Sequence, residues 1–195
     1  MNKKYQVILA DPPWLFEKGY WDRSQSNPAS HYPCMKTVDI CNIGIDLRQY
    51  IDSPSHLYLW TTSRHLMDGD AVAVCKAWGY EPMNIITWCK PQISLGYYFR
   101  NSSEHLIFAI RGKGLQTKDR TQGTWVKSDR LKHSQKPDIF YKLIEKMSYE
   151  PRLELFARNK REGWDCWGNE VESDISLGEL KGEDDDKTMQ TRTRN

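Results

Sequence analysis

Apolar residues along this chain follow two spacings that alternate in order. Short runs typical of buried strands occur at Tyr5–Ala10, His56–Trp60, Met83–Cys89, His105–Ile110 and Arg152–Ala157. Helical spacing is found in Val38–Tyr50, Leu66–Trp78 and Asp138–Met147. Strands that alternate with helices are typical of a parallel sheet covered by helices. We therefore predict an α/β fold with a mostly parallel sheet and helices on both faces.

Three polar segments interrupt this alternation. Residues 15–36 and 111–136 lack sustained apolar periodicity, so each is expected to form a long loop. From residue 172 to the end, seven acidic and four basic residues occur with almost no apolar ones, which predicts a disordered tail over 172–195. The expected folded domain is then 1–171. With a net charge of +2 for the whole chain and −3 for the tail, this domain carries +5, which is compatible with a nucleic-acid partner.

Composition narrows the class of protein. The mean hydropathy of −0.75 and the lack of any apolar run of membrane-spanning length indicate a cytoplasmic protein without a membrane partner. The five cysteines are scattered and form no C-x-x-C pair, so neither a disulfide framework nor a structural metal site is expected. No glycine-rich dinucleotide fingerprint or P-loop sequence is present.

The most distinctive motif is Asp11-Pro12-Pro13-Trp14, which follows the first apolar strand directly. Two prolines fix φ and remove amide donors, so the turn is stiff and its carbonyls are expected to be free of local amide partners. Asp11 offers a carboxylate, and Trp14 offers a flat ring for base stacking. The structural alternative is a proline-rich turn with a buried Trp.

These groups suit the exocyclic amine of adenine. That amine is a weak nucleophile because its lone pair is delocalised into the ring. Two acceptors for its N–H bonds would favour a more tetrahedral nitrogen, and Asp11 and the Pro12 carbonyl can supply them. Aromatic faces would also attract a sulfonium methyl donor. The motif therefore indicates a site for methyl transfer to a base amine.

The whole chain up to about Val171 resembles the DPPW-motif adenine-N6 methyltransferases, the family named after the seventy-kilodalton subunit of the messenger-RNA adenosine methyltransferase. It is most similar to the short bacterial and phage members. The resemblance rests on these blocks: Ala10–Trp14, His31–Pro33, Leu57–Trp60, Ala77–Tyr80, Thr87–Lys90, His133–Pro137, Leu153–Arg158, Gly163–Trp164 and Trp167–Glu170.

The resemblance implies a Rossmann-like fold with a permuted motif order and S-adenosyl-L-methionine as methyl donor. It implies that Asp11, Pro12, Pro13 and Trp14 form the catalytic turn, with Asp11 near the base amine or the methionine amino group. The remaining implied cofactor-binding residues are Lys136, Arg158, Asn159, Asn169 and Glu170. The structural alternatives are that Lys136 is a solvated loop lysine, that Arg158 neutralises a nearby acid, and that Asn169 and Glu170 cap a helix or end the fold.

On the acceptor side, Tyr32 resembles the aromatic residue of a target-side gate loop, and Glu104 resembles an acid near the acceptor pocket. Tyr97, in the segment 96–100, could stack on a base. Each of the three has a structural alternative. Tyr32 could be a loop aromatic that covers the core, Glu104 a charge at the edge of a strand, and Tyr97 part of a packed loop. The basic residues of 113–133 could follow a phosphate backbone or form a solvated face.

We therefore predict a site-specific adenine-N6 methyltransferase, with DNA preferred over RNA because of the likeness to bacterial and phage members. A duplex substrate would have to present a flipped adenine. The alternatives are the same chemistry on RNA, methylation of the cytosine amine, and a catalytically silent nucleic-acid-binding subunit. No separate target-recognition domain is apparent, so specificity would come from the loops 15–36 and 91–132 or from a partner chain. A homodimer or a complex with a partner subunit is possible.

Overall fold

The computed structural model describes residues 3–16, 34–94, 98–130 and 135–177. Its strands are β1 (Tyr5–Ala10), β2 (Ile51–Thr61), β3 (Glu81–Ser94), β4 (Asn101–Arg111), β5 (Trp125–Lys127), β6 (Arg152–Leu155) and β7 (Asp165–Trp167). Its helices are α1 (Thr37–Leu47), α2 (Ser63–Met67), α3 (Asp70–Ala77) and α4 (Asp138–Met147).

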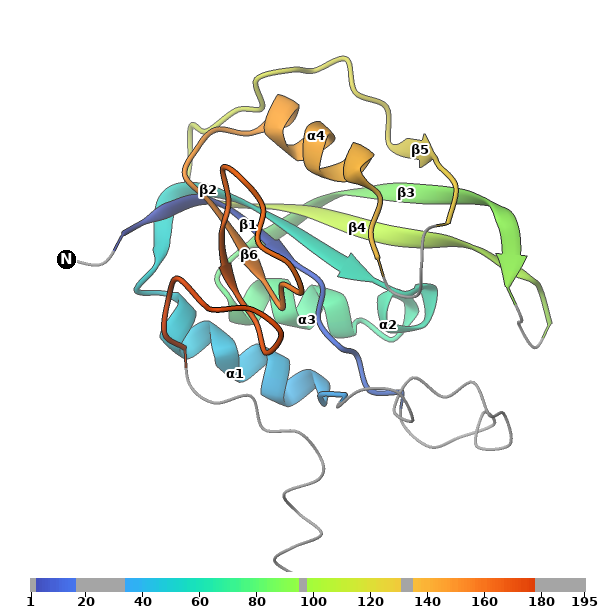
Figure 1. The fold of residues 1–195 in the computed structure, drawn as a ribbon, viewed down its shortest axis with the longest axis horizontal. Helices are drawn as coiled ribbons and strands as arrows, with labels where there is room; N and C mark the ends of the chain where they lie inside the picture. The colour runs from blue at the N-terminus through green and yellow to red at the C-terminus, as the bar shows by residue number, and fades with distance from the viewer. Residues whose placement is uncertain (1–2, 17–33, 95–97, 131–134, 178–195) are drawn as a thin grey trace, which may run out of the picture.

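The strands form one mixed sheet in the order β5-β3-β4-β2-β1-β6-β7. Within it, β4 runs antiparallel to both of its neighbours, whereas the other described pairs are parallel. Figure 1 shows α4 on one face of the sheet and α1, α2 and α3 on the other. The prediction of a mostly parallel α/β sheet with helices on both faces is confirmed.

Each face of the sheet has its own core. In β1, Ile8 and Ala10 belong to the core under α1 and α3, while Val7 and Leu9 belong to the core under α4. A strand buried on both faces reads as a continuous apolar run, which is why the sequence of β1 does not alternate.

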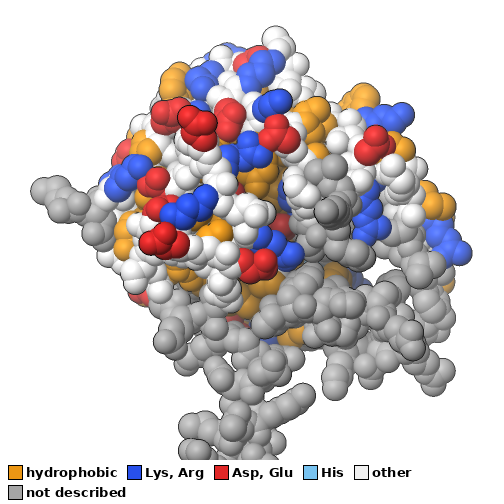
Figure 2. Space-filling view, in the orientation of Figure 1, with side chains coloured by type: hydrophobic (Ala, Val, Ile, Leu, Met, Phe, Trp, Pro, Cys, Tyr) orange, Lys and Arg blue, Asp and Glu red, His pale blue; other side chains and the backbone are white. Residues whose placement is uncertain are grey.

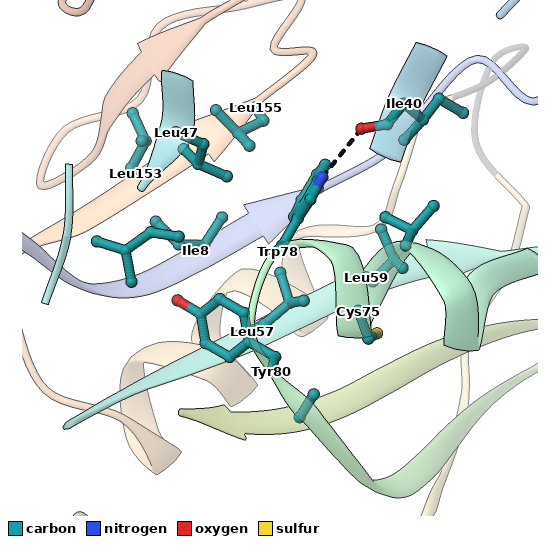
Figure 3. Close-up of a cluster of buried hydrophobic side chains, with 14 of the residues drawn as sticks. Ile8, Ile40, Leu47, Leu57, Leu59, Cys75, Trp78, Tyr80, Leu153 and Leu155 are labelled. Atoms are coloured by element: carbon teal, nitrogen blue, oxygen red, sulfur yellow. Dashed lines mark hydrogen bonds between the residues drawn. The ribbon is translucent and has the colours of Figure 1, made fainter. Parts of the chain in front are cut away.

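Trp78 connects α1 to the sheet. Its indole N–H donates to the Ile40 carbonyl at 2.9 Å, the hydrogen bond that is drawn as a dashed line in Figure 3. A Cβ atom on Gly44 would lie 2.5 Å from Trp78 Cδ1, so the absence of a side chain lets α1 approach the ring closely.

Several boundaries differ from the predictions. The expected helix Leu66–Trp78 is two helices, α2 and α3, because Gly69 adopts φ +82° between them. The last predicted strand ends two residues early because Phe156 adopts φ +62°. The expected loop 111–136 contains β5, which pairs with β3, and β7 was not predicted.

The charged segment assigned to a tail begins inside the fold. Ile175 is buried in the core beside α1, and the Asp174 carboxylate accepts the Cys166 amide at 2.9 Å. Ile175 and Leu177 therefore pack against the hydrophobic core, although they lie beyond the expected boundary at 171. Residues 178–195 lie outside the described part of the chain.

The ends of β6 and β7 approach each other closely at Gly168. A Cβ atom there would lie 2.2 Å from the Ala157 carbonyl oxygen, and backbone cannot move as a flexible side chain can. We predict that Gly168→Ala lowers the free energy of unfolding by roughly 1–3 kcal/mol or more, as overpacking does. Thermal or urea unfolding measures the change.

Gly123→Ala is the matched control, since a Cβ there meets no atom within 4 Å. Its free energy of unfolding should change by no more than about 0.5 kcal/mol. Equal unfolding curves for the two variants would contradict the steric explanation.

Candidate functional site

The candidate site lies at the edge of the sheet where its parallel strands end. Asp11 follows β1, and Lys136 lies just before α4. Because β4 is antiparallel, it begins at this edge, and Glu104 lies near its start, opposite Trp88 of β3. In open α/β sheets this is the edge where ligands bind.

Four side chains form a row of alternating charge, which we call the charged row: Lys90, Glu104, Lys136 and Asp11. Lys136 Nζ lies 2.6 Å from Asp11 Oδ2 and 3.5 Å from Glu104 Oε2. The other carboxylate oxygen of Glu104 accepts a hydrogen bond from Lys90. Residues far apart in the sequence, from β3, β4, the approach to α4 and the end of β1, thus share one set of ion pairs.

The lysines of the charged row rest on aromatic rings. Lys136 Nζ lies 5.1 Å from the Trp60 ring centroid, and Lys90 Nζ lies 4.4 Å from that of Trp88. Both tryptophans pack edge-on against Phe140 of α4. Cations are attracted to such ring faces. The floor of the site is therefore part of the hydrophobic core between α4 and the sheet.

Burial and neighbouring charges have opposite effects on the pKa values of Lys136 and Glu104. The Lys136 side chain is 13% exposed, and this burial would lower its pKa, but the Asp11 and Glu104 carboxylates together hold the pKa above its usual value. Burial would raise the pKa of Glu104, yet Lys136 and Lys90 keep it below its usual value. Both groups are therefore held in their charged forms.

The turn after Asp11 is fixed by backbone hydrogen bonds. The Trp14 amide donates to the Pro12 carbonyl at 2.9 Å, and the Met35 amide donates to the Pro13 carbonyl at 2.7 Å. The expectation that these carbonyls have no local amide partner is wrong, because the chain at Trp14 folds back and the segment at Met35 pairs with the turn. A carbonyl oxygen has two lone pairs, so the Pro12 oxygen can still accept a second hydrogen bond.

Trp14 is 6% exposed and is held on several sides. Its indole N–H donates to the Trp60 carbonyl at 3.0 Å, and its ring stacks on the imidazole of His65 with centroids 4.9 Å apart. His65 Nδ1 in turn lies 2.7 Å from Asp70 Oδ2. Little of the ring is left to stack on a base, in contrast to the open face that the sequence suggests. A base-stacking role for Trp14 stays a prediction.

A second group of predicted residues lies in the loops after β6 and β7, which are adjacent parallel strands. Arg158 Nε lies 3.7 Å from Glu170 Oε1, and both side chains are exposed. Asn159 and Asn169 are also exposed. The structure brings these loops together and links them to the first group through the Asp11 amide, which donates to the Leu155 carbonyl at 3.5 Å.

Two predicted substrate-binding residues, Tyr32 and Tyr97, lie outside the described residues. The described residues contain no grouping of three or more His, Cys, Asp or Glu side chains placed to hold a metal ion. None of their helices is long and apolar enough to cross a membrane.

Sequence reasoning missed Glu154, which lies in β6 opposite Leu9 and on the same face as Asp11. The Tyr141 hydroxyl donates to Glu154 Oε1 at 2.7 Å. Burial, aided by the nearby Asp11 carboxylate, raises the pKa of Glu154 to about 7 although the Tyr141 hydrogen bond opposes the rise. A lone acid within the apolar strand Arg152–Leu155 was the signal that could have found it.

Lys90 and His65 were missed as well. Lys90 directly follows the predicted strand Met83–Cys89 and His65 directly precedes the predicted helix Leu66–Trp78, so the apolar pattern indicated no role for either. The site as a whole offers the carboxyl groups of Asp11, Glu104 and Glu154, which can accept N–H bonds, and the buried ammonium of Lys136, which can bind a carboxylate. That donor and acceptor set suits an amino-acid-like ligand and a base amine side by side.

The raised pKa of Glu154 predicts a pH-dependent stability. Its usual value is 4.5, so between this value and about 7 the folded protein binds more protons than the unfolded chain. Stability from this group is complete below the unfolded pKa and is lost as pH rises through the folded one. Glu154→Gln should therefore gain stability relative to the parent protein, by roughly 2 kcal/mol, between about pH 5 and about pH 8.

Unfolding by urea across that pH range measures the difference. Glu162→Gln, which removes an exposed carboxylate in the loop after β6, is the matched control and should follow the parent. Parallel pH curves for Glu154→Gln and the parent would contradict the raised pKa.

Comparison with known proteins identifies relatives of this chain and the family to which it belongs. A type II methyltransferase, M.MunI, from Mycoplasma sp is 29% identical over an alignment of 194 residues that covers 87% of this chain and 79% of the relative. The human N(6)-adenosine-methyltransferase catalytic subunit METTL3 is 26% identical over 180 residues, 87% of this chain but 28% of its own length. A putative N(6)-adenosine-methyltransferase MT-A70-like protein of Medicago truncatula is 28% identical over 179 residues, 86% of this chain and 26% of its own length.

The chain thus spans about a quarter of the plant and human proteins and most of the bacterial one. The MT-A70 family model matches residues 5–170, which include the turn after β1, the charged row and the loops after β6 and β7. The protein belongs to the MT-A70 family.

Proposed function

We propose that this protein transfers a methyl group from S-adenosyl-L-methionine to the N6 amine of adenine in DNA. The observation that carries the proposal is the Asp11 carboxylate, held 2.6 Å from Lys136 in an acid-proline-proline-aromatic turn at the carboxyl end of β1. The family membership supports methyl transfer, and the similarity to a type II methyltransferase from Mycoplasma sp, 79% of which this chain covers, supports DNA.

The donor set fits the methyl donor. The buried Lys136 ammonium would pair with the carboxylate of its methionine part, and Asp11 or Glu154 would accept from its amino group. Glu170, with Arg158, Asn159 and Asn169 beside it, would bind the ribose hydroxyls and the adenine ring. When bound, the donor supplies an electrophilic methyl group on sulfonium.

The residues of the chain would activate the amine by orienting it. Asp11 and the second lone pair of the Pro12 carbonyl would accept the two N–H bonds and thereby release the nitrogen lone pair from the ring. Glu104, which lies on the other side of Lys136 from Asp11, would also contact the base. Preorganised acceptors of this kind act without reorganising during the reaction.

A nucleic-acid strand would approach along the end of the sheet formed by β3, β4 and β5. Figure 2 shows Lys and Arg with few acids on this part of the molecule. Arg100, Lys127 and Arg130 are exposed there, as are the rings of Tyr98 and Phe99. Phosphate contact by such cations is independent of sequence.

RNA is the alternative substrate, supported by the similarity to METTL3 at nearly the same coverage of this chain. The other alternative is a silent nucleic-acid-binding subunit. The intact Asp11-Pro12-Pro13-Trp14 turn and its ion pair with Lys136 favour an enzyme.

The test is incubation with isotope-labelled S-adenosyl-L-methionine and parallel DNA and RNA pools, followed by nucleoside mass spectrometry. We expect N6-methyladenine in DNA, and loss of at least about 100-fold of the rate in Asp11→Asn, as when an oriented polar group is removed from a site. Glu81→Gln, an exposed carboxylate at the other end of β3, should keep the parent rate.

Product in RNA alone would replace DNA by RNA as the substrate. No product in either pool, or full activity in Asp11→Asn, would contradict the proposed enzyme.

A further inference from the structure

Lys90 is the member of the charged row that is neither part of the Asp11-Pro12-Pro13-Trp14 motif nor given a role in the proposed methyl transfer. Its side chain is 11% exposed, which makes it as enclosed as Lys136. A cation in that position needs a partner, because burying an unpaired charge is costly. The described partners of Lys90 are the Glu104 carboxylate and the Trp88 ring.

Glu104 is shared between two cations, one on each carboxylate oxygen. Oε1 accepts from Lys90, whereas Oε2 lies 3.5 Å from Lys136 Nζ. Lys136 is likewise shared between two acids, but unequally, since it lies 2.6 Å from Asp11. The more direct contact of Lys136 is therefore with Asp11, and that of Glu104 is with Lys90.

This unequal sharing depends on Lys90. Without its charge, Glu104 would be a largely enclosed carboxylate with Lys136 as the remaining cation of the row. The attraction between the two opposite charges would then draw Lys136 away from Asp11. Lys90 would thus act on the surroundings of Asp11 through Glu104 and Lys136.

We propose that Lys90 is a positioning residue: by neutralising Glu104 it leaves Lys136 on Asp11 and holds the Glu104 carboxylate toward the acceptor side of the site. The inference rests on the proposed function for its kinetic consequences and on the described geometry for its electrostatic ones. It gives the distal part of β3 a role in shaping the site.

The charged groups that face Glu104 are few among the described residues. Lys90 approaches from β3, Lys136 from the segment before α4, and Asp11 from beyond Lys136. His105, the next residue in β4, points to the other face, where its ring contacts Ser63 and Thr87. The direction of the Glu104 pKa, held low by Lys136 and Lys90 against burial, agrees with this arrangement.

The first experiment follows the Glu104 carboxyl directly by carbon-13 NMR across a pH titration, without any substrate. In Lys90→Met the Glu104 midpoint should move to higher pH, because the cation is lost while the burial remains. Lys90→Arg should stay near the parent midpoint. Lys142→Met, which removes an exposed cation on α4, is the matched control and should not shift it.

The second experiment is a double-mutant cycle on methyl transfer. Lys90→Met should lower kcat/KM by up to about 100-fold, as misplacement of a reacting group does, and should shift the acidic limb of the pH profile to higher pH. In a Glu104→Gln background the same change should have little further effect, because there is no carboxylate left to neutralise. Lys90→Arg should restore most of the rate.

An unshifted Glu104 midpoint in Lys90→Met would overturn the proposal, and so would an equal loss of kcat/KM in the two backgrounds. Thermal unfolding identifies variants that do not fold, and Lys90→Gln then replaces Lys90→Met. If the parent methylates nothing, the proposed function fails, but the titration still decides the positioning role of Lys90.

Discussion

The enclosure of the Lys136 ammonium between two carboxylates is the interaction on which the site depends. A lysine on a tryptophan ring, with most of its side chain removed from water, keeps its charge only because Asp11 and Glu104 replace the lost solvation. This single cation orders the surrounding acids. It also couples the side chains of the charged row, so that a change in the charge or position of one affects the others.

Sheet topology is what brings these groups together. Asp11 and Lys136 are 125 residues apart in the sequence. They meet because β1 lies near the middle of the sheet and because the segment before α4 returns to the edge at which β1 and β2 end. The floor beneath them, made of Trp60, Trp88 and Phe140, is also the core that attaches α4 to the sheet. The stability of the fold and the geometry of the site therefore share the same contacts.

Much of this could be predicted from the sequence. The apolar runs identified five strands and the helix α4, and the acid-proline-proline-aromatic motif identified the turn after β1. Other features could not be predicted, for specific reasons. A three-residue strand such as β5 exists only because β3 offers it an edge, and the break at Gly69 follows from a backbone angle that the apolar spacing of Leu66–Trp78 does not reveal. Glu154 acquires its role from Tyr141 of α4 and Asp11 after β1, and Lys90 acquires its role from Glu104 of β4. The local sequence around each residue does not reveal these partners.

The reversed direction of β4 has a consequence for how the protein can diversify. Glu104 enters the site from the start of its strand, and its register is set by pairing with both β2 and β3. The connection between β3 and β4 lies beyond that paired region. Lengthening or exchanging this connection would alter what the outer end of the sheet touches while Glu104 stayed in place. The fold thus separates a connection whose length can change from a strand register that keeps Glu104 in place.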